Sequence, residues 1–225
     1  MMLRQDLQAV LARLPHPTDR SGPRDAYGQV LWENIGYLID DHRRHALFTE
    51  FSDRIGLAPQ AILEADEADL HDIASRGGMR PEVRVGRWRQ IAEITLGPGG
   101  GDLDRMLRAL PLHKARALLK LYPAIGDPCA DKILLFAGIS PRPSLESNGV
   151  RTLVRMGFIQ EHKAYAATWR AAMDVLREQG EPDFDWLTGA YLTLRDHGRE
   201  RCRCAEPACP ACPLDFTCAH APASG

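Results

Sequence analysis

Apolar residues recur at helical spacing along almost the whole chain. The first such pattern is formed by Leu3, Leu7, Val10, Leu11 and Leu14. Pro15 and Pro17 end it, because proline cannot continue a helix. Further helices are expected over residues 30–39, 47–51, 61–63, 70–74, 88–96, 102–110, 112–122, 127–137, 149–156, 162–179 and 184–195. The alternation that is typical of strands is almost absent, so the pattern predicts an all-α fold.

Turn-forming residues separate these helical patterns. Residues 16–24 are rich in Pro, Gly, Ser and Asp and are expected to form a linker, and residues 97–101 (GPGGG) a loop. Asp102 is expected to cap the helix that follows this loop. Pro141 and Pro143 interrupt the chain again after the helix at 127–137.

The composition is that of a soluble globular protein, because 44% of the 225 residues are apolar and 26% are charged. No apolar run is long enough for a membrane helix, and the N-terminus lacks a signal-peptide core, so we expect a cytoplasmic location, at the nucleoid if the source is bacterial. The net charge of −2 argues against non-specific coating of nucleic acid. Basic segments at 42–44, 80–89, 113–116 and 195–203 are either solvated helix faces or the lining of one groove.

Five of the six cysteines lie between Cys202 and Cys218, a crowding that indicates metal binding in a reducing compartment. Four of them, Cys202, Cys209, Cys212 and Cys218, are separated by six, two and five residues. Thiolates in this number hold zinc or an iron–sulfur cluster. Zinc sites usually offer two close pairs, and only Cys209 and Cys212 form one, so the spacing favours a compact loop around an iron–sulfur cube. Zinc and unliganded thiols are the alternatives, Cys204 is interpreted as a bystander, and Cys129 as a core residue.

Residues 121–130 (LYPAIGDPCA) resemble the hairpin of helix–hairpin–helix glycosylases, written L-P-G-x-G-x-x-T-A. Such a turn presents backbone N–H groups beside a helix N-terminus, where they hold a DNA phosphate without reading sequence. The predicted DNA-binding residues of the turn are Pro123, Ala124, Ile125 and Gly126. Gly126 matches the second glycine of the motif, whereas Ala124 replaces the first, so the turn must accept a Cβ there.

Two further segments extend the resemblance. Residues 197–202 (HGRERC) are similar to the H-G-R-x-x-C entry into the cluster loop of endonuclease III-type glycosylases. Residues 145–151 (LESNGVR) are similar to that family's V-D-(T/S)-(H/N)-(V/I)-x-R segment, with Gly149 in place of a branched residue. Together with the cysteine spacing, the resemblance to the endonuclease III family spans about residues 26–218.

The resemblance implies a 4Fe–4S cluster held by Cys202, Cys209, Cys212 and Cys218. It also implies a barrel-like helical domain at residues 26–140 that contains the hairpin, and a cluster domain at residues 1–25 and 141–225. Double-stranded DNA with a damaged or mismatched base is expected to lie across the cleft between the domains. Arg199, with Arg201 and Arg203, is expected to face phosphate, and the protein is expected to be a monomer.

The catalytic positions depart from the family pattern. The family's nucleophilic lysine, two residues after the second hairpin glycine, corresponds to Pro128, and its aspartate, eighteen residues further on, corresponds to Glu146. Proline cannot attack the sugar, so strand scission through a Schiff base is not expected. Lys132 lies one helical turn later as a substitute candidate, with a phosphate contact or a surface charge as the alternative. Glu146 either stabilises the sugar cation or only caps the next helix.

Base flipping also needs side chains that fill the vacated space. The resemblance places Leu38 near the intercalating position of the early helix and Met79 near a second wedge, and Tyr37 beside the pocket for the extruded base. For each of these residues, a place in the core or on a plain surface is the alternative.

The sequence therefore predicts a base-excision-repair DNA N-glycosylase that is monofunctional and uses Glu146 and water. The alternatives are a protein on the same scaffold that binds damaged DNA with little or no catalysis, and a zinc-bearing interaction module.

Overall fold

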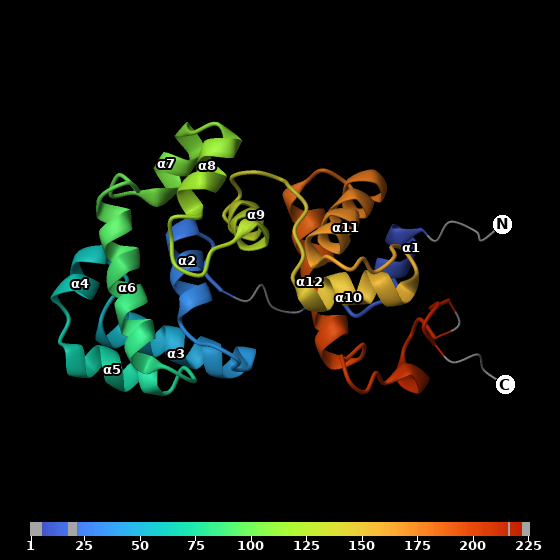
Figure 1. Cartoon of the computed structure of the whole chain (residues 1–225), viewed down its shortest axis with the longest axis horizontal. Coiled ribbons are helices and arrows are strands. Elements are labelled where there is room, and N and C mark those ends of the chain that lie inside the picture. Colours follow the sequence, from blue (N-terminus) through green and yellow to red (C-terminus); the bar gives the residue numbers. More distant parts are fainter. Residues whose placement is uncertain (1–5, 18–21, 216, 222–225) are drawn as a thin grey trace. The chain divides into compact units, whose positions relative to one another are not determined.

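The computed structural model describes residues 6–17, 22–215 and 217–221 (Figure 1). These residues form twelve α-helices and one short 3-10 helix, without a β-strand among them, which confirms the all-α prediction. The chain divides into two compact units, residues 21–139 and residues 1–20 with 140–225. Within the described part, no helix is both long enough and apolar enough to cross a membrane. Leu3 and residues 18–21 of the predicted linker lie outside the described residues.

The unit at residues 21–139 consists of eight helices among its described residues. They are α2 (Ala26–Asn34), α3 (Asp41–Arg54), α4 (Pro59–Glu64), α5 (Glu67–Ser75), α6 (Pro81–Leu96), α7 (Leu103–Ala109), α8 (Leu112–Leu119) and α9 (Asp127–Phe136). The long helix α6 packs against α2, α4 and α5. Phe51 and Trp88 are fully buried in this core, with their rings edge to face at 4.7 Å.

The other unit combines the N-terminal helix with the C-terminal third of the chain. Its helices are α1 (Leu7–Leu11), α10 (Ser147–Met156), α11 (Tyr165–Gln179), α12 (Phe184–Glu200) and the 3-10 turn Cys209–Ala211. Helix α10 packs along α12, and α1 contacts both α11 and α12. Val10, Leu14, Met156 and Leu214 form a small core of their own, against which Cys212 and Cys218 pack.

Aspartate side chains cap the start of six helices in the described part of the chain. Each accepts a hydrogen bond from a backbone N–H in the first turn, and they are Asp6, Asp25, Asp40, Asp66, Asp102 and Asp183. The predicted cap at Asp102 is among them, because its Oδ1 accepts from the Arg105 N–H at 3.0 Å. The predicted loop at residues 97–101 is also present, with Gly100 and Gly101 in left-handed conformations.

The prediction of one helix over residues 30–39 is wrong. Helix α2 ends at Asn34, and Leu38 adopts a left-handed conformation with φ of 55°. The apolar spacing continues past Asn34, but the chain turns so that the Tyr37 N–H donates to the Gly77 carbonyl at 2.8 Å. A contact between segments far apart in the sequence therefore overrides the local periodicity. Helix α6 also begins earlier than predicted, at Pro81. The first turns of this helix are rich in charged residues, so the apolar pattern did not indicate them.

Candidate DNA-binding surface and cysteine loop

The connection between α8 and α9 is a tight hairpin. Ala124 sits in it with φ of 61°, so the turn accepts a Cβ at a position that glycine would occupy with less strain. Gly126 precedes α9 in an extended conformation, and no side chain caps the first turn of that helix. Backbone N–H groups at an uncapped helix N-terminus attract an anion. The geometry is therefore suited to holding a phosphate.

Polar side chains fix the hairpin from both sides. The Asn34 amide Nδ2 donates to the Val30 and Pro123 carbonyls, both at 3.0 Å. Arg116 forms an ion pair of 2.8 Å with the buried carboxylate of Asp131. The turn is thus tied to α2 through Asn34, while the Arg116–Asp131 pair joins α8 to α9.

Two loops of the same unit carry the predicted wedge residues. Leu38 is 80% exposed and Met79 is 67% exposed, so neither belongs to the core. The loops approach closely because Gly78 has no side chain: a Cβ there would lie 2.4 Å from the Tyr37 carbonyl oxygen. Their exposure excludes a place in the core, and their role as wedges in DNA stays a prediction.

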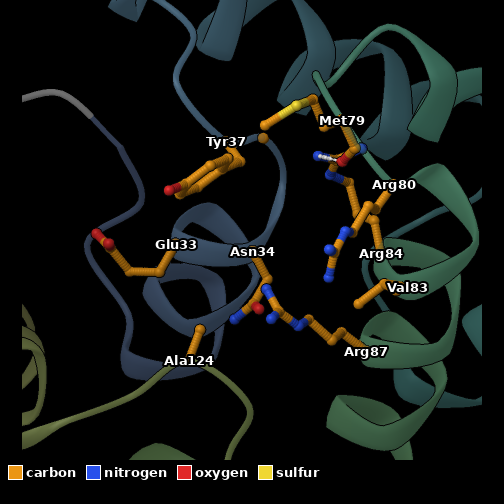
Figure 2. Close-up of a pocket in the computed structure, with 10 residues that line it drawn as sticks. Glu33, Asn34, Tyr37, Met79, Arg80, Val83, Arg84, Arg87 and Ala124 are labelled. Atoms are coloured by element: carbon orange, nitrogen blue, oxygen red, sulfur yellow. Dashed lines mark hydrogen bonds between the residues drawn. The ribbon is translucent and has the colours of Figure 1, made fainter.

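A buried arginine holds the second of these loops. The Arg84 guanidinium donates to the Ala74 carbonyl at 2.6 Å. It also donates to the Met79 carbonyl at 3.1 Å, and both of these residues are drawn in Figure 2. Burial lowers the pKa of Arg84, and the neighbouring charge of Arg87 lowers it further. The hydrogen bonds to the two carbonyls keep this buried cation satisfied, and they position Met79.

A pocket of about 570 Å³ lies among these loops, the hairpin and α6 (Figure 2). Its lining consists of Glu33, Asn34, Gly36, Tyr37, Met79, Arg80, Val83, Arg84, Arg87 and Ala124. In the described part of the chain, the three non-glycine residues with positive φ are Leu38, Arg80 and Ala124. Arg80 and Ala124 line the pocket, and Leu38 adjoins Tyr37 in it. Strained backbone of this kind gathers at functional sites.

The sequence indicated only part of this pocket. Tyr37 lines it as a predicted pocket residue, with a side chain that is 58% exposed. The basic segment at residues 80–89 contributes three arginines to it, whereas Arg89 turns away to the Leu63 carbonyl and Glu67. Asn34 was missed, because a polar residue at the end of an apolar helix carries no signal of its own.

Lys132 is not a surface charge. Its side chain is 12% exposed, pairs with Glu33 of the pocket lining, and lies over the Phe136 ring at 5.3 Å. Cys129, one turn before it, packs against the core of this unit, as predicted. Burial, followed by the nearby Glu33 carboxylate, raises the pKa of the Cys129 thiol well above its usual value.

Glu146 lies in the other unit, directly before α10, and it caps this helix. Its Oε1 accepts from the Gly149 N–H at 3.0 Å, and its Oε2 accepts from the Asn148 amide at 2.7 Å. The side chain is partly exposed. Tyr165 is close enough that, after burial, the Glu146 charge contributes to raising the pKa of its hydroxyl. The capping role is therefore present, and it leaves a carboxylate partly open to solvent.

Two arginines of α10 form hydrogen bonds with backbone carbonyls of the segment that carries the cysteines. Arg155 donates to the carbonyls of Cys202, Arg203 and Cys204, and one of its nitrogens lies 3.5 Å from the Cys202 Sγ. Arg151 donates to the carbonyls of Cys202 and Gly198. Arg199, a predicted phosphate contact, is partly buried in the last turn of α12.

The four predicted ligand cysteines line one cavity, together with apolar side chains that include Met156 and Leu214. Cys204 is exposed and is not part of that lining. Burial and the charges of the other three thiols raise the pKa of Cys212, although the Leu214 N–H, 3.4 Å from its Sγ, opposes this effect. His197 Nε2 lies 3.8 Å from the same sulfur.

In the part of the chain that the structure describes, no three or more His, Cys, Asp or Glu side chains are drawn together closely enough to hold one metal ion. Four thiols that line one cavity are nevertheless the donor set that an iron–sulfur cluster requires, and two of their sulfurs, those of Cys202 and Cys212, have an N–H group within 3.5 Å. The residues present therefore fit such a cluster.

Comparisons with known proteins identify the family. No family model matches the chain. A thymine-DNA glycosylase from Aeropyrum pernix is 30% identical over 162 residues, which cover 72% of this chain and 68% of the relative. The chain belongs to the endonuclease III-like family of helix–hairpin–helix DNA glycosylases. A thymine/uracil-DNA glycosylase from Pyrobaculum aerophilum is also 30% identical, over 99 residues that cover 44% of this chain and 43% of the relative.

Solved structures agree on the fold of this glycosylase. A trapped endonuclease III–DNA covalent intermediate matches with a TM-score of 0.73 at 15% identity, covering 98% of both chains. A thermostable thymine-DNA glycosylase matches with a TM-score of 0.73 at 18% identity, covering 95% of this chain and 94% of that one. The predictions of a helix–hairpin–helix glycosylase fold and of a DNA N-glycosylase are thereby confirmed.

Proposed function

We propose that this glycosylase removes thymine or uracil from double-stranded DNA and leaves the strand intact. The observation that carries the proposal is the 30% identity to a thymine-DNA glycosylase over 162 residues, a stretch long enough to cover 72% of the chain. The second relative, a thymine/uracil-DNA glycosylase, supports the same substrate class.

Glu146 is the proposed catalytic carboxylate. When the bond between the sugar C1′ and the base nitrogen breaks, positive charge develops on the sugar, and a carboxylate close to it stabilises that charge. A water molecule then bonds to C1′ and loses its proton, for which the carboxylate is an acceptor. Partial exposure of Glu146 at the start of α10 supports this role.

Strand scission by the usual lyase route needs an amine that attacks C1′. Pro128 occupies the family's lysine position and has no amine to offer. Lys132 is engaged with Glu33 and nearly buried, which disfavours it as a substitute nucleophile. We therefore infer a monofunctional enzyme.

We also infer that Cys202, Cys209, Cys212 and Cys218 hold a 4Fe–4S cluster. Bound there, the cluster would supply a rigid cross-link within the loop at residues 202–218 rather than chemistry on the DNA. Arg155, through its hydrogen bonds to three carbonyls of this loop, ties the loop to the helix that Glu146 caps.

A panel of duplexes tests the activity. Thymine or uracil opposite guanine, oxidised pyrimidines, oxidised guanine and an abasic site are each incubated with purified protein, and free base, strand breaks and borohydride-trapped adducts are measured. We expect release of thymine or uracil without breaks or adducts. Breaks or adducts would contradict the monofunctional assignment, and release of other bases alone would contradict the substrate class.

Glu146→Gln tests the carboxylate. Its amide oxygen can still accept from the Gly149 N–H, so α10 keeps its cap while the charge is lost. Base release is expected to fall by about a hundredfold or more. Glu161→Gln removes a carboxylate of the same unit and is expected to leave the rate unchanged.

One observation favours the alternative of a damage-binding protein: both oxygens of Glu146 already accept hydrogen bonds within α10. In that case the protein binds an abasic duplex tightly but releases no base from any member of the panel.

A further inference from the structure

The pocket among the wedge loops contains two polar groups without a partner. The Arg87 side chain is exposed, and among the described residues nothing forms a hydrogen bond or an ion pair with its guanidinium. Asn34 is only 4% exposed, and its Oδ1 accepts no hydrogen bond, although its Nδ2 makes two. A buried carbonyl oxygen without a donor is costly unless a ligand supplies one.

Contacts within the unit fix Asn34, whereas the exposed Arg87 is presented by a helix. Asn34 is fixed by its own amide and by the Trp88 indole, which donates to its backbone carbonyl at 3.1 Å. Arg87 stands on α6, one turn after Val83 in the same lining. Figure 2 shows the Arg87 side chain directed toward the middle of the pocket, where Asn34 lies. The pocket thus combines a fork of donors, a carbonyl acceptor and the flat ring of Tyr37.

The position of the pocket relates it to DNA. Leu38 and Met79 project beside it as exposed apolar side chains, the kind that proteins insert between stacked bases when a nucleotide is extruded. The base that remains in the helix then has an unpaired edge close to the wedges. A pocket that offers the Arg87 donors and the Asn34 acceptor at this place can receive that edge.

Removal of thymine requires that the enzyme distinguish the base opposite it. Thymine is a normal component of DNA opposite adenine, so an enzyme that removes it must sense the base on the other strand. Guanine presents two adjacent acceptors, O6 and N7, which match an arginine fork, and it has N–H donors on its pairing edge. Adenine presents an amino donor where guanine has O6, so the same fork meets a donor. On its pairing edge, N1 of adenine is an acceptor and cannot donate to Asn34 Oδ1, whereas N1 of guanine carries a hydrogen.

We propose that this pocket reads the guanine opposite the pyrimidine that is removed, with Arg87 donating to the guanine acceptors and Asn34 Oδ1 accepting from its N–H groups. This inference rests on the proposed function for its substrate class. It assigns Tyr37 to the partner base, which departs from the expectation that Tyr37 faces the extruded one. Thymine and uracil fit the pocket less well, because N3–H separates their two carbonyl acceptors.

The test measures binding, so that it does not depend on catalysis. Duplexes with a tetrahydrofuran abasic analogue opposite guanine or adenine are titrated with the full-length protein. We expect at least about fivefold tighter binding with guanine, the lower range of one bidentate arginine contact. In Arg87→Ala, which removes an exposed side chain and leaves the core intact, the preference is expected to disappear. Arg105→Ala removes a charge from an exposed residue of α7 outside the pocket and should keep the preference.

Base analogues on the unaltered protein give a second measurement. Replacing the opposite guanine by 7-deazaguanine removes N7, and replacing it by 2-aminopurine removes both O6 and the N1–H donor, so each is expected to weaken binding by a few fold or more. Equal binding of all partners, or a guanine preference that survives Arg87→Ala, would overturn the inference. If instead the protein prefers guanine in binding but releases no base from any duplex, the proposed function is wrong and the inference about the pocket stands.

Discussion

At the scale of single residues, strain and exposure point to the same place. A left-handed conformation costs a non-glycine residue roughly 1–2 kcal/mol. Leu38, Arg80 and Ala124 all adopt one, and all lie at or beside the pocket in the unit at residues 21–139. Contacts from neighbouring elements, such as the Asn34 hydrogen bond to Pro123 next to Ala124, keep these conformations in place.

The exposed wedges give a prediction at this scale. Leu38→Ala and Met79→Ala remove side chains that are not part of the core, so the thermal midpoint is expected to change little. Affinity for an abasic-analogue duplex is expected to fall by roughly tenfold for each, because less of the gap between bases is filled. Leu96→Ala removes an exposed leucine outside the pocket and serves as the control. Equal affinity of all three variants would show that the wedges do not enter DNA.

At the scale of elements, an ion-pair network joins α3 to α5. Arg54 of α3 pairs with Asp69 and Asp72 of α5 at 2.8 and 2.6 Å, and Arg76 at the end of α5 pairs with Glu50 of α3. The hydrogen bond from Arg76, followed by that from Arg54, lowers the pKa of Glu50. The hydrogen bond from Arg54 is the largest cause that lowers the pKa of Asp72.

This network predicts a pH dependence. Because the folded state holds both carboxylates ionised to lower pH than the unfolded state, their contribution to stability is present above about pH 4 and is lost as the pH falls further. The thermal midpoint is therefore expected to drop more steeply below pH 4 in the natural protein than in Arg54→Met, and 1 M salt should reduce the difference at pH 7. Parallel midpoint curves for the two proteins would contradict the prediction.

At the scale of the whole molecule, the cysteine loop depends on parts from both ends of the chain. Val10 and Leu14 from the N-terminus pack with Met156 and Leu214, and Cys212 and Cys218 pack against this cluster. Helix α10 joins the same loop through Arg151 and Arg155. Loss of a ligand should therefore affect the unit formed by residues 1–20 and 140–225 as a whole.

Two cysteine variants test this. Cys212→Ser is expected to abolish most iron and sulfide binding and to lower the thermal midpoint, because a partly buried proposed ligand and its cross-link are lost. Cys204→Ser, at an exposed thiol outside the cavity, is expected to keep about four irons and four sulfides per chain. Anaerobic purification followed by iron, sulfide and zinc analysis gives the result. Zinc in place of iron, or iron loss in Cys204→Ser alone, would contradict the assignment.

Features with a local physical cause were predictable from the sequence. The Asp102 cap needs only an acceptor within reach of the next turn, and the helices that follow it are set by apolar spacing. The hairpin around Gly126 and the spacing of Cys202, Cys209, Cys212 and Cys218 are short motifs whose chemistry is carried by neighbouring residues. These features were sufficient to indicate the fold and the family.

The pocket was decided only by the tertiary structure. Its residues come from the end of α2, the loops at residues 35–39 and 77–80, α6 and the hairpin, which are far apart in the sequence. Apolar spacing wrongly predicted that α2 continues through Leu38. Periodicity along the sequence reflects only local preference and does not include hydrogen bonds to backbone that is distant in the sequence. The hydrogen bonds from Tyr37 to the Gly77 carbonyl and from Arg84 to the Met79 carbonyl outweigh that preference. The resulting pocket brings together Asn34 Oδ1 and the Arg87 guanidinium, neither of which has a hydrogen-bond partner among the described residues.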